Sequence, residues 1–395
     1  MRVRFLCIAG LAAWPTCVNI GHTADTSPVA QSVAETQPGR IGSAVERTIR
    51  PMMEEFHIPG MAVGIVVGRT TYVFNYGVAS TQTGKPVTNN TLFELGSISK
   101  VFTATLTSYA QVGGYLSLSD TTAKYLPILS GTAFGKVTLL NLGTHTAGGL
   151  PLQVPDDISN DAELLQYLKN WRPSCAQGTC RTYNNPSIGT LGLITAKAMG
   201  GSFETLVEQQ LFPALGMRNS YIDVPRIKMA DYAEGYTNTS ASVRMTPGEL
   251  WREAYGVKST AADLVRFMEV NMKLAVTNGW LQRAIEVTHT GYFRAGVMTQ
   301  DLIWEEYSDP VTLRTLLKGN SPDMLFKSTP VTELSPPGRG RDDAWINKTG
   351  STNGFGAYIA FVPKRRLGIV LLANRNYPIE ARVTAAYKIL TSLSD

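Results

Sequence analysis

Short β-rich runs stand near both ends of this chain of 395 residues, and they constrain its fold more than any other feature. Residues 61–67 and 71–78 are two such runs around a short turn, a pattern typical of a β-hairpin. Three more follow at 344–349, 355–362 and 367–373. Strands at both ends must pair with one another to bury their apolar faces. The predicted fold class is therefore α+β: an antiparallel sheet built from N- and C-terminal segments and flanked by helices, with an inserted mostly helical region.

Helical spacing of apolar residues fills in the rest of the order. Helices are predicted at 41–56 and at 380–393, next to the β-rich runs, while residues 160 to about 290 follow mostly helical patterns. The clearest helices of that middle part are expected at 188–199, 203–211 and 260–274. We expect an α/β part from about 41–120 and 320–395, and a helical part from about 121–319.

Residues 1–24 have the composition of a secretory signal peptide. Arg2 and Arg4 precede a short apolar run at 5–14, and Thr23-Ala24 offers a small-residue cleavage site. The run is too short to cross a bilayer as a helix. We expect residues 25–395 to be exported to the periplasm as a monomer without membrane insertion, with residues 25 to about 40 as a flexible lead-in.

Charge and histidine spacing argue against several classes of function. The net charge of +5 comes from scattered basic residues, and the short clusters at 339–341 and 364–366 are typical of solvated turns, so no nucleic-acid partner is expected. His57, His145 and His289 lie far apart and show no metal-ligand spacing. We therefore expect no metal and no cofactor.

Ser97 and Lys100 form a Ser-x-x-Lys pair at the start of a predicted helix. The helical pattern at 101–112 stops at Gly113-Gly114, so Ser97 lies in the first turn and Lys100 one turn on, on the same face. A partly buried lysine with a lowered pKa can activate a serine as a nucleophile. On its own the pair is weak evidence, because a capping serine beside a solvated lysine has the same sequence.

Two further motifs make the pattern specific. Tyr183-Asn184-Asn185 precedes a predicted helix, and Lys348-Thr349-Gly350 ends a predicted strand. Ser-x-x-Lys, a polar triplet ending in Asn, and Lys-Thr-Gly in this order are typical of penicillin-recognising serine enzymes. A second Tyr-x-Asn at Tyr236 falls in a polar stretch, 236–247, that is predicted to be a long loop, so we interpret it as a decoy.

With these motifs the chain resembles the serine β-lactamase and penicillin-binding-protein superfamily, and within it the class C β-lactamases, or cephalosporinases. The narrower likeness rests on residues 148–155, on 254–259 (Ala-Tyr-Gly-Val-Lys-Ser) and on 347–356, and the resemblance runs from about residue 41 to the C-terminus. It implies a β-lactamase/transpeptidase-like fold.

The resemblance also implies roles for individual residues. Ser97 would attack the lactam carbonyl, Tyr183 would act as general base and acid, and Lys100 and Lys348 would lower the pKa of its phenol. Whether Lys100 or Tyr183 takes the first proton stays open. Backbone N–H groups of Ser97 and Ser351 would form the oxyanion hole. The substrate-binding residues implied are Gln153, Asn185, Tyr255, Thr349, Gly350, Ser351, Asn376 and Arg382.

The chain departs from the pattern of its relatives at two positions. Asn347 precedes Lys348 where many class C enzymes carry histidine, and Ile379 follows Tyr377-Pro378 where many carry asparagine. Neither change touches the nucleophile or the base. The second is expected to weaken a contact with the substrate carboxylate and to shift substrate preference.

The cysteines suggest a disulfide close to the middle motif. Cys7 and Cys17 would leave with the signal peptide, whereas Cys175 and Cys180 remain, only five positions apart. In an oxidising compartment these two can close a short loop, which we state as a hypothesis.

The sequence thus predicts an enzyme that hydrolyses β-lactam antibiotics, preferentially cephalosporins, through an acyl-enzyme on Ser97, and so confers resistance to them. Two alternatives on the same fold are a DD-peptidase or penicillin-binding protein, which would deacylate slowly, and a carboxylesterase. A catalytically dead binding protein is a further alternative, but it would have no chemical need for Lys100, Tyr183 and Lys348 together.

Overall fold

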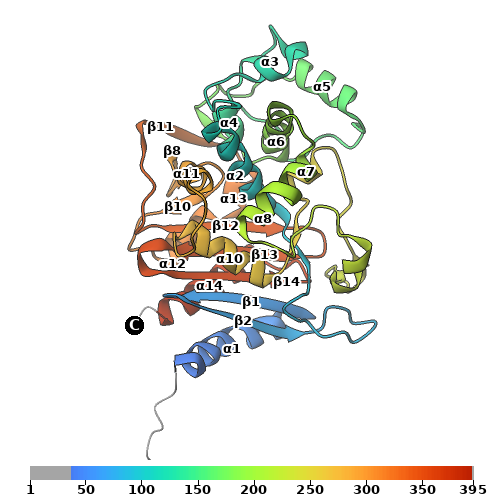
Figure 1. Ribbon diagram of the computed structural model, residues 1–395, viewed down its shortest axis with the longest axis vertical. Coiled ribbons are helices and arrows are strands. Elements are labelled where there is room, and N and C mark those ends of the chain that lie inside the picture. The colour runs from blue at the N-terminus through green and yellow to red at the C-terminus, as the bar shows by residue number, and fades with distance from the viewer. Residues whose placement is uncertain (1–36, 394–395) are drawn as a thin grey trace, which may run out of the picture.

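The computed structural model describes residues 37–393, and its centre is a ten-stranded sheet whose neighbouring strands all run antiparallel (Figure 1). Across the sheet the order is β2-β1-β14-β13-β12-β10-β9-β8-β11-β4. The strands are β1 (Gly60–Val67), β2 (Thr70–Gly77), β4 (Cys180–Arg181), β8 (Gly291–Ala295), β9 (Met298–Gln300), β10 (Glu305–Tyr307), β11 (Thr329–Gly338), β12 (Trp345–Ser351), β13 (Gly356–Val362) and β14 (Leu367–Ala373). The expected signal peptide lies outside the described residues.

The two ends of the chain meet in this sheet, as the sequence predicts. Strand β1 pairs with β14 in a register that places Val63 opposite Leu371. Every residue of β14 is buried, because helices cover both faces of the sheet. Ile369 and Leu371 pack into one apolar core, while Val370 and Leu372 pack into the other. This alternation is the two-residue period of a β-strand.

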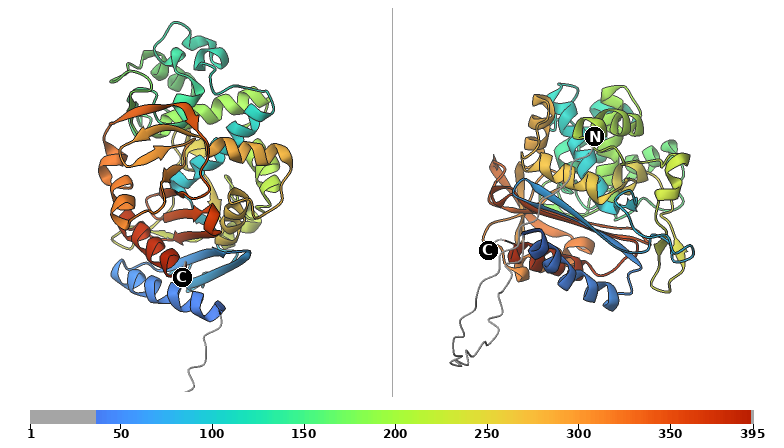
Figure 2. Two further views of the ribbon diagram at one scale, coloured as in Figure 1. Left: turned by 90° about the vertical axis from the view of Figure 1, so that its left-hand side faces the viewer. Right: turned by 60° about the horizontal axis from the view of Figure 1, so that its bottom comes forward.

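Helices α1 (Gln37–Glu55) and α14 (Ile379–Ser392) cover one face of the sheet (Figure 2). Ile41, Val45 and Ile49 follow one another at four-residue spacing along α1, and all three are buried in the core on this face. Both helices confirm the sequence prediction to within a few residues.

The opposite face is covered by the helical region, whose central element is α2 (Ser99–Val112). This helix is buried on almost every side and contacts α6 and α11. The remaining helices are α3 (Thr122–Tyr125), α4 (Leu139–Gly143), α5 (Asp161–Asn170), α6 (Asn185–Met199), α7 (Phe203–Leu206), α8 (Phe212–Leu215), α9 (Trp251–Tyr255), α10 (Ala261–Asn271), α11 (Gly279–Thr288), α12 (Leu313–Gly319) and α13 (Pro322–Phe326). Between residues 37 and 393 no helix has both the length and the apolar character needed to span a membrane.

The sheet extends further than the sequence predicts. Strands β8, β9 and β10 all lie within residues 121–319, which the sequence assigns to the helical part. Strands β9 and β10 have only three residues each, too few for an alternating pattern to appear, and β10 contains two glutamates. The predicted loop at 236–247 contains part of a small hairpin, β5 (Gly235–Tyr236) with β6 (Ser242–Val243).

Candidate active site

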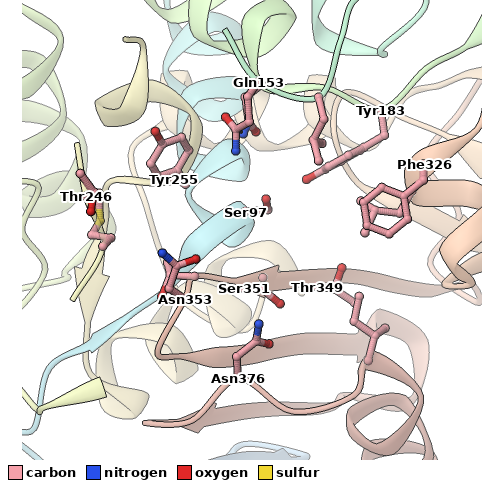
Figure 3. A pocket seen from close by; sticks show the side chains of 17 residues that line it. Ser97, Gln153, Tyr183, Thr246, Tyr255, Phe326, Thr349, Ser351, Asn353 and Asn376 are labelled. Atoms are coloured by element: carbon pink, nitrogen blue, oxygen red, sulfur yellow. The ribbon is translucent and has the colours of Figure 1, made fainter. Parts of the chain in front are cut away.

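A cavity of about 490 Å³ opens where the end of β12 meets the start of α2 (Figure 3). Most of the side chains singled out from the sequence line it: Ser97, Gln153, Tyr183, Asn185, Tyr255, Thr349, Gly350, Ser351 and Asn376. Figure 3 shows Ser97 near the middle, with Gln153 and Tyr183 on one side and Ser351 and Thr349 on the other. Segments far apart in the sequence therefore converge on the predicted nucleophile.

Ser97 and Lys100 are placed together by a short 3-10 turn, η1 (Gly96–Ile98), that leads directly into α2. The Lys100 Nζ donates a hydrogen bond to Ser97 Oγ at 2.9 Å and another to the carbonyl oxygen of Ala254 at 2.8 Å. Burial lowers the pKa of Lys100 to about 8, since the opposing pull of Tyr183 offsets only part of the lost solvation. The ammonium can therefore release a proton near neutral pH.

Tyr183 carries the second perturbed group. Burial raises the pKa of its phenol, but the positive charges of Lys100 and Lys348 and a hydrogen bond with Ser97 outweigh that effect and lower the pKa to about 8. The two ammonium nitrogens lie 5.3 and 5.0 Å from the centre of the ring. Lys100 and Tyr183 also shift each other's pKa, because the ammonium and the phenolate attract. The pair can supply a base to Ser97.

Three further residues lie around Tyr183, and the sequence predicts a role in the site for none of them. The guanidinium of Arg181 lies 5.5 Å from the ring centre and forms a buried ion pair with Glu305 at 2.9 Å. The ring of His145 lies 4.6 Å away on another side. Burial and the nearby cations hold the pKa of His145 well below its usual value, so this imidazole is neutral. Only the position of Arg181, two residues before Tyr183, could have been noticed in the sequence.

The end of β12 approaches the turn that carries Ser97 closely because Gly350 has no side chain. A Cβ at this position would lie 2.0 Å from the carbonyl oxygen of Leu95. The contact brings Ser351 and Thr349 to the cavity wall opposite Gln153. Lys348 is almost fully buried, and its Nζ donates to the carbonyl oxygen of Thr349 at 3.1 Å.

Gln153 and Asn185 form a polar pair on the other wall. The Asn185 Nδ2 donates to Gln153 Oε1 at 2.8 Å, while Asn185 Oδ1 has no partner among the described residues. Asn184 caps helix α6 by accepting from the backbone N–H of Ser187 at 2.7 Å, which fixes where Asn185 lies. Asn185 Oδ1 is therefore held in place as a buried acceptor whose hydrogen-bonding capacity is unused.

Arg382 differs from the expectation that it meets substrate. Its side chain is fully buried and does not line the cavity. The guanidinium lies behind β12 and donates to the Ser351 Oγ at 2.9 Å and to the Asn376 Oδ1 at 2.6 Å. Arg382 therefore acts on the cavity through Ser351 and Asn376. Lys100 does not line the cavity either, and it reaches the cavity only through its hydrogen bond to Ser97.

Other lining residues, apart from Ile379, carry no signal in the sequence. They include the apolar Leu325, Phe326, Ile379 and Met245, and also Thr246. Figure 3 shows Phe326 and Thr246 on opposite sides of the cavity. They come from loops and from the ends of helices, where no period identifies them. The decoy Tyr236 is outside the lining, and its hydroxyl accepts from the backbone N–H of Thr81 at 2.7 Å.

The disulfide hypothesis is confirmed, because Cys175 and Cys180 are joined. Among residues 37–393, no group of three or more His, Cys, Asp or Glu side chains is arranged to hold a metal ion. The groups that the structure places around the Ser97 hydroxyl are two ammonium groups and a phenol.

Known proteins are similar to this chain over most of its length. The family model described as Beta-lactamase matches residues 45–393. A beta-lactamase from Lysobacter lactamgenus is 48% identical over 93% of this chain and 94% of its own. The structure of a D-alanine carboxypeptidase from Burkholderia cenocepacia is 58% identical, with a TM-score of 0.86 over 89% of this chain and 99% of that one. A class C beta-lactamase in complex with cefoxitin is 49% identical, with a TM-score of 0.87 over 89% and 99%.

Proposed function

Because the chain belongs to the β-lactamase family and shares the fold of class C enzymes, we propose that it hydrolyses β-lactam antibiotics, preferentially cephalosporins, through an acyl-enzyme on Ser97. The observation that carries the proposal is the 2.9 Å contact between Lys100 Nζ and Ser97 Oγ, beside a phenol with a lowered pKa. A hydroxyl becomes a nucleophile when such a base removes its proton.

The first half of the reaction forms the acyl-enzyme. The Lys100–Tyr183 pair takes the proton of Ser97 as its oxygen attacks the lactam carbonyl. Backbone N–H groups of Ser97 and Ser351 stabilise the developing oxyanion. The same pair then returns the proton to the lactam nitrogen, and the ring opens.

The second half frees the enzyme. Tyr183 accepts a proton from a water molecule whose oxygen attacks the ester carbonyl, and it returns that proton to Ser97 Oγ as the bond between this oxygen and the acyl carbon breaks. Lys100 and Lys348 keep the phenolate available because both favour its negative charge.

The cavity walls supply the substrate contacts. Gln153 and Asn185 bind the acylamino side chain, with Tyr255 beside them, whereas Thr349 and Lys348 face the substrate carboxylate. Asn376 supports the carboxylate side, oriented by its hydrogen bond with Arg382. Ile379 supplies no polar contact there, so the carboxylate relies on the end of β12.

Residues 1–24 direct the chain to the periplasm, where a monomer of residues 25–395 meets the antibiotic and confers resistance. The basic start and short apolar run of this segment support the proposal.

A second candidate activity is that of a D-alanine carboxypeptidase, the description given to the relative that is 58% identical. Both activities form an ester on serine and differ in substrate and in the rate of deacylation. Steady-state kcat/KM values for a cephalosporin and for a peptide ending in D-Ala-D-Ala separate them. We expect the cephalosporin to be the far better substrate, and a preference for the peptide would overturn the proposed function.

A further inference from the structure

The disulfide between Cys175 and Cys180 closes a loop that ends three residues before Tyr183. Strand pairing alone holds the backbone weakly at this point. Strand β4 has two residues, lies at the edge of the sheet and pairs only with β11, through Thr329 and Pro330. So short an edge pairing restrains the backbone weakly, because it contains few ladder hydrogen bonds.

The disulfide loop also contacts the segment that leads to Gln153. The backbone N–H of Gly178 donates to the carbonyl oxygen of Thr146, and that of Ser174 donates to Gly148, both at 2.9 Å. The loop approaches so closely that a Cβ on Gly149, whose φ is +88°, would lie 1.9 Å from Ser174 Oγ. The loop therefore joins the two segments that carry Tyr183 and Gln153.

Between the disulfide and the phenol lies Arg181, which packs directly on Tyr183. Its Nη2 binds Glu305, its Nε donates to Gln300 at 2.6 Å, and its guanidinium lies over the Tyr183 ring. The backbone N–H of Thr182 donates to the carbonyl oxygen of His145 at 2.9 Å. A shift of the loop would thus be transmitted to Tyr183 within three residues.

We propose that the Cys175–Cys180 disulfide is a positioning element for Tyr183, which holds the phenol between Lys100 and Lys348. The inference rests on the proposed function for its kinetic consequences but not for its effect on the phenol. Without the disulfide, the chain before Tyr183 samples more conformations and the phenol spends less time near the two ammonium groups. A displacement of about 1 Å at a reacting group can cost on the order of 10²-fold in rate.

The test uses the double variant Cys175→Ser/Cys180→Ser, with Cys175→Ala/Cys180→Ala as an independent second form. Peptide mapping first verifies the disulfide in the wild-type protein. Trypsin is expected to release residues 170–181 as one peptide because Arg172 precedes Pro173, and reduction with a dithiol should add two hydrogens to its mass. Thermal unfolding of each variant separates loss of fold from loss of position.

The kinetic expectation is a fall in kcat of about tenfold or more with a smaller change in KM. The acidic limb of the pH–rate profile should move to higher pH, since a phenol farther from Lys100 and Lys348 has a higher pKa. In a Tyr183→Phe background, removal of the disulfide should have no further effect, because coupled residues are not additive. An unchanged kcat and profile, or an equal loss in both backgrounds, would overturn the proposal.

A readout independent of turnover distinguishes this inference from the proposed function. The absorbance change of phenolate formation, measured as wild type minus Tyr183→Phe, should isolate a phenol that titrates near a pH of about 8. In the disulfide-free variants, or in wild type reduced by a dithiol that leaves two protein thiols, this titration should move upward. If β-lactams are not turned over, the proposed function fails, and the titration still decides the role of the disulfide.

Discussion

Tyr183 is under two opposing influences at the scale of the single residue. A buried phenol should be harder to ionise than one in water, yet the two neighbouring ammonium groups reverse the effect and lower its pKa to about 8. The charge balance, rather than burial alone, makes the side chain useful as a base near neutral pH.

Substitution of Tyr183 by Phe removes the hydroxyl that transfers the proton. We expect kcat for a cephalosporin to fall by about 10²- to 10⁴-fold, the usual contribution of a general base. The chain supplies a matched control in Tyr236→Phe, which alters the other Tyr-x-Asn outside the cavity. Equal rates for wild type and Tyr183→Phe would refute the assigned role.

The variant Lys348→Met tests whether the charge of Lys348 lowers the pKa of Tyr183. Lys348 lowers the pKa of Tyr183, so its removal raises that pKa and leaves less phenolate at a given pH. Because the base must be unprotonated, kcat/KM falls as the pH drops below about 8, and in the variant this acidic limb moves to higher pH. Lys364→Met, at an exposed lysine, should leave the profile in place. If the acidic limb of kcat/KM lies at the same pH in Lys348→Met and in wild type, Lys348 does not control the pKa of Tyr183.

Residues that belong to short motifs could be predicted from the sequence, whereas the side chains that pack around them could not. Ser97, Tyr183 and Lys348 carry local signals in the sequence because each belongs to a short motif. Arg382 is among the implied substrate-binding residues, but its burial depends on how α14 packs on β13 and β14, which no local pattern contains. Phe326 is 67% exposed on a five-residue helix, and nothing in the sequence marks it as part of a cavity.

At the scale of elements, the site depends on how closely β12 packs against the turn that carries Ser97. Gly350→Ala would place a methyl group 2.0 Å from the carbonyl oxygen of Leu95, so the strand must move away. We expect loss of most activity and a drop of roughly 1–3 kcal/mol in the free energy of unfolding, the usual cost of overpacking. Gly42→Ala in α1 is the control, since its nearest neighbour would be 3.6 Å away. Normal kinetics of Gly350→Ala would show that the close approach is dispensable.

A buried ion pair joins two strands that are not neighbours, with Arg181 on β4 and Glu305 on β10. Glu305→Leu leaves the guanidinium buried without its partner, which should lower the free energy of unfolding by about 3–5 kcal/mol. Urea unfolding measures this, and the combined variant Arg181→Met/Glu305→Leu should recover part of the loss. Asp343→Asn, in an exposed pair with Arg341, should change stability little. A small effect of Glu305→Leu alone would mean that water already reaches the pair.

The length of a strand explains whether the sequence could predict it. Strands β1, β13 and β14 have seven or eight residues, and their apolar character identifies them. Strands β9 and β10 have three residues each and gain their stability from neighbours that lie elsewhere in the chain. The local sequence pattern does not show which distant strands will pair with a short strand.

At the scale of the whole molecule, the cavity exists only because distant segments fold together. Ser97 comes from the turn before α2, Tyr183 from the segment between β4 and α6, and Lys348 from β12. The disulfide and the Arg181–Glu305 pair both support the phenol from outside the cavity. The central claim is that this assembly forms an ester on Ser97 and then hydrolyses it.

The most direct test is intact-mass measurement during turnover of a cephalosporin by the purified mature protein. We expect rapid hydrolysis, a transient adduct that maps to Ser97, no lasting adduct once substrate is consumed, and neither adduct nor turnover in Ser97→Ala. A lasting adduct with little turnover would indicate a penicillin-binding protein instead. Turnover that survives in Ser97→Ala would contradict the account as a whole.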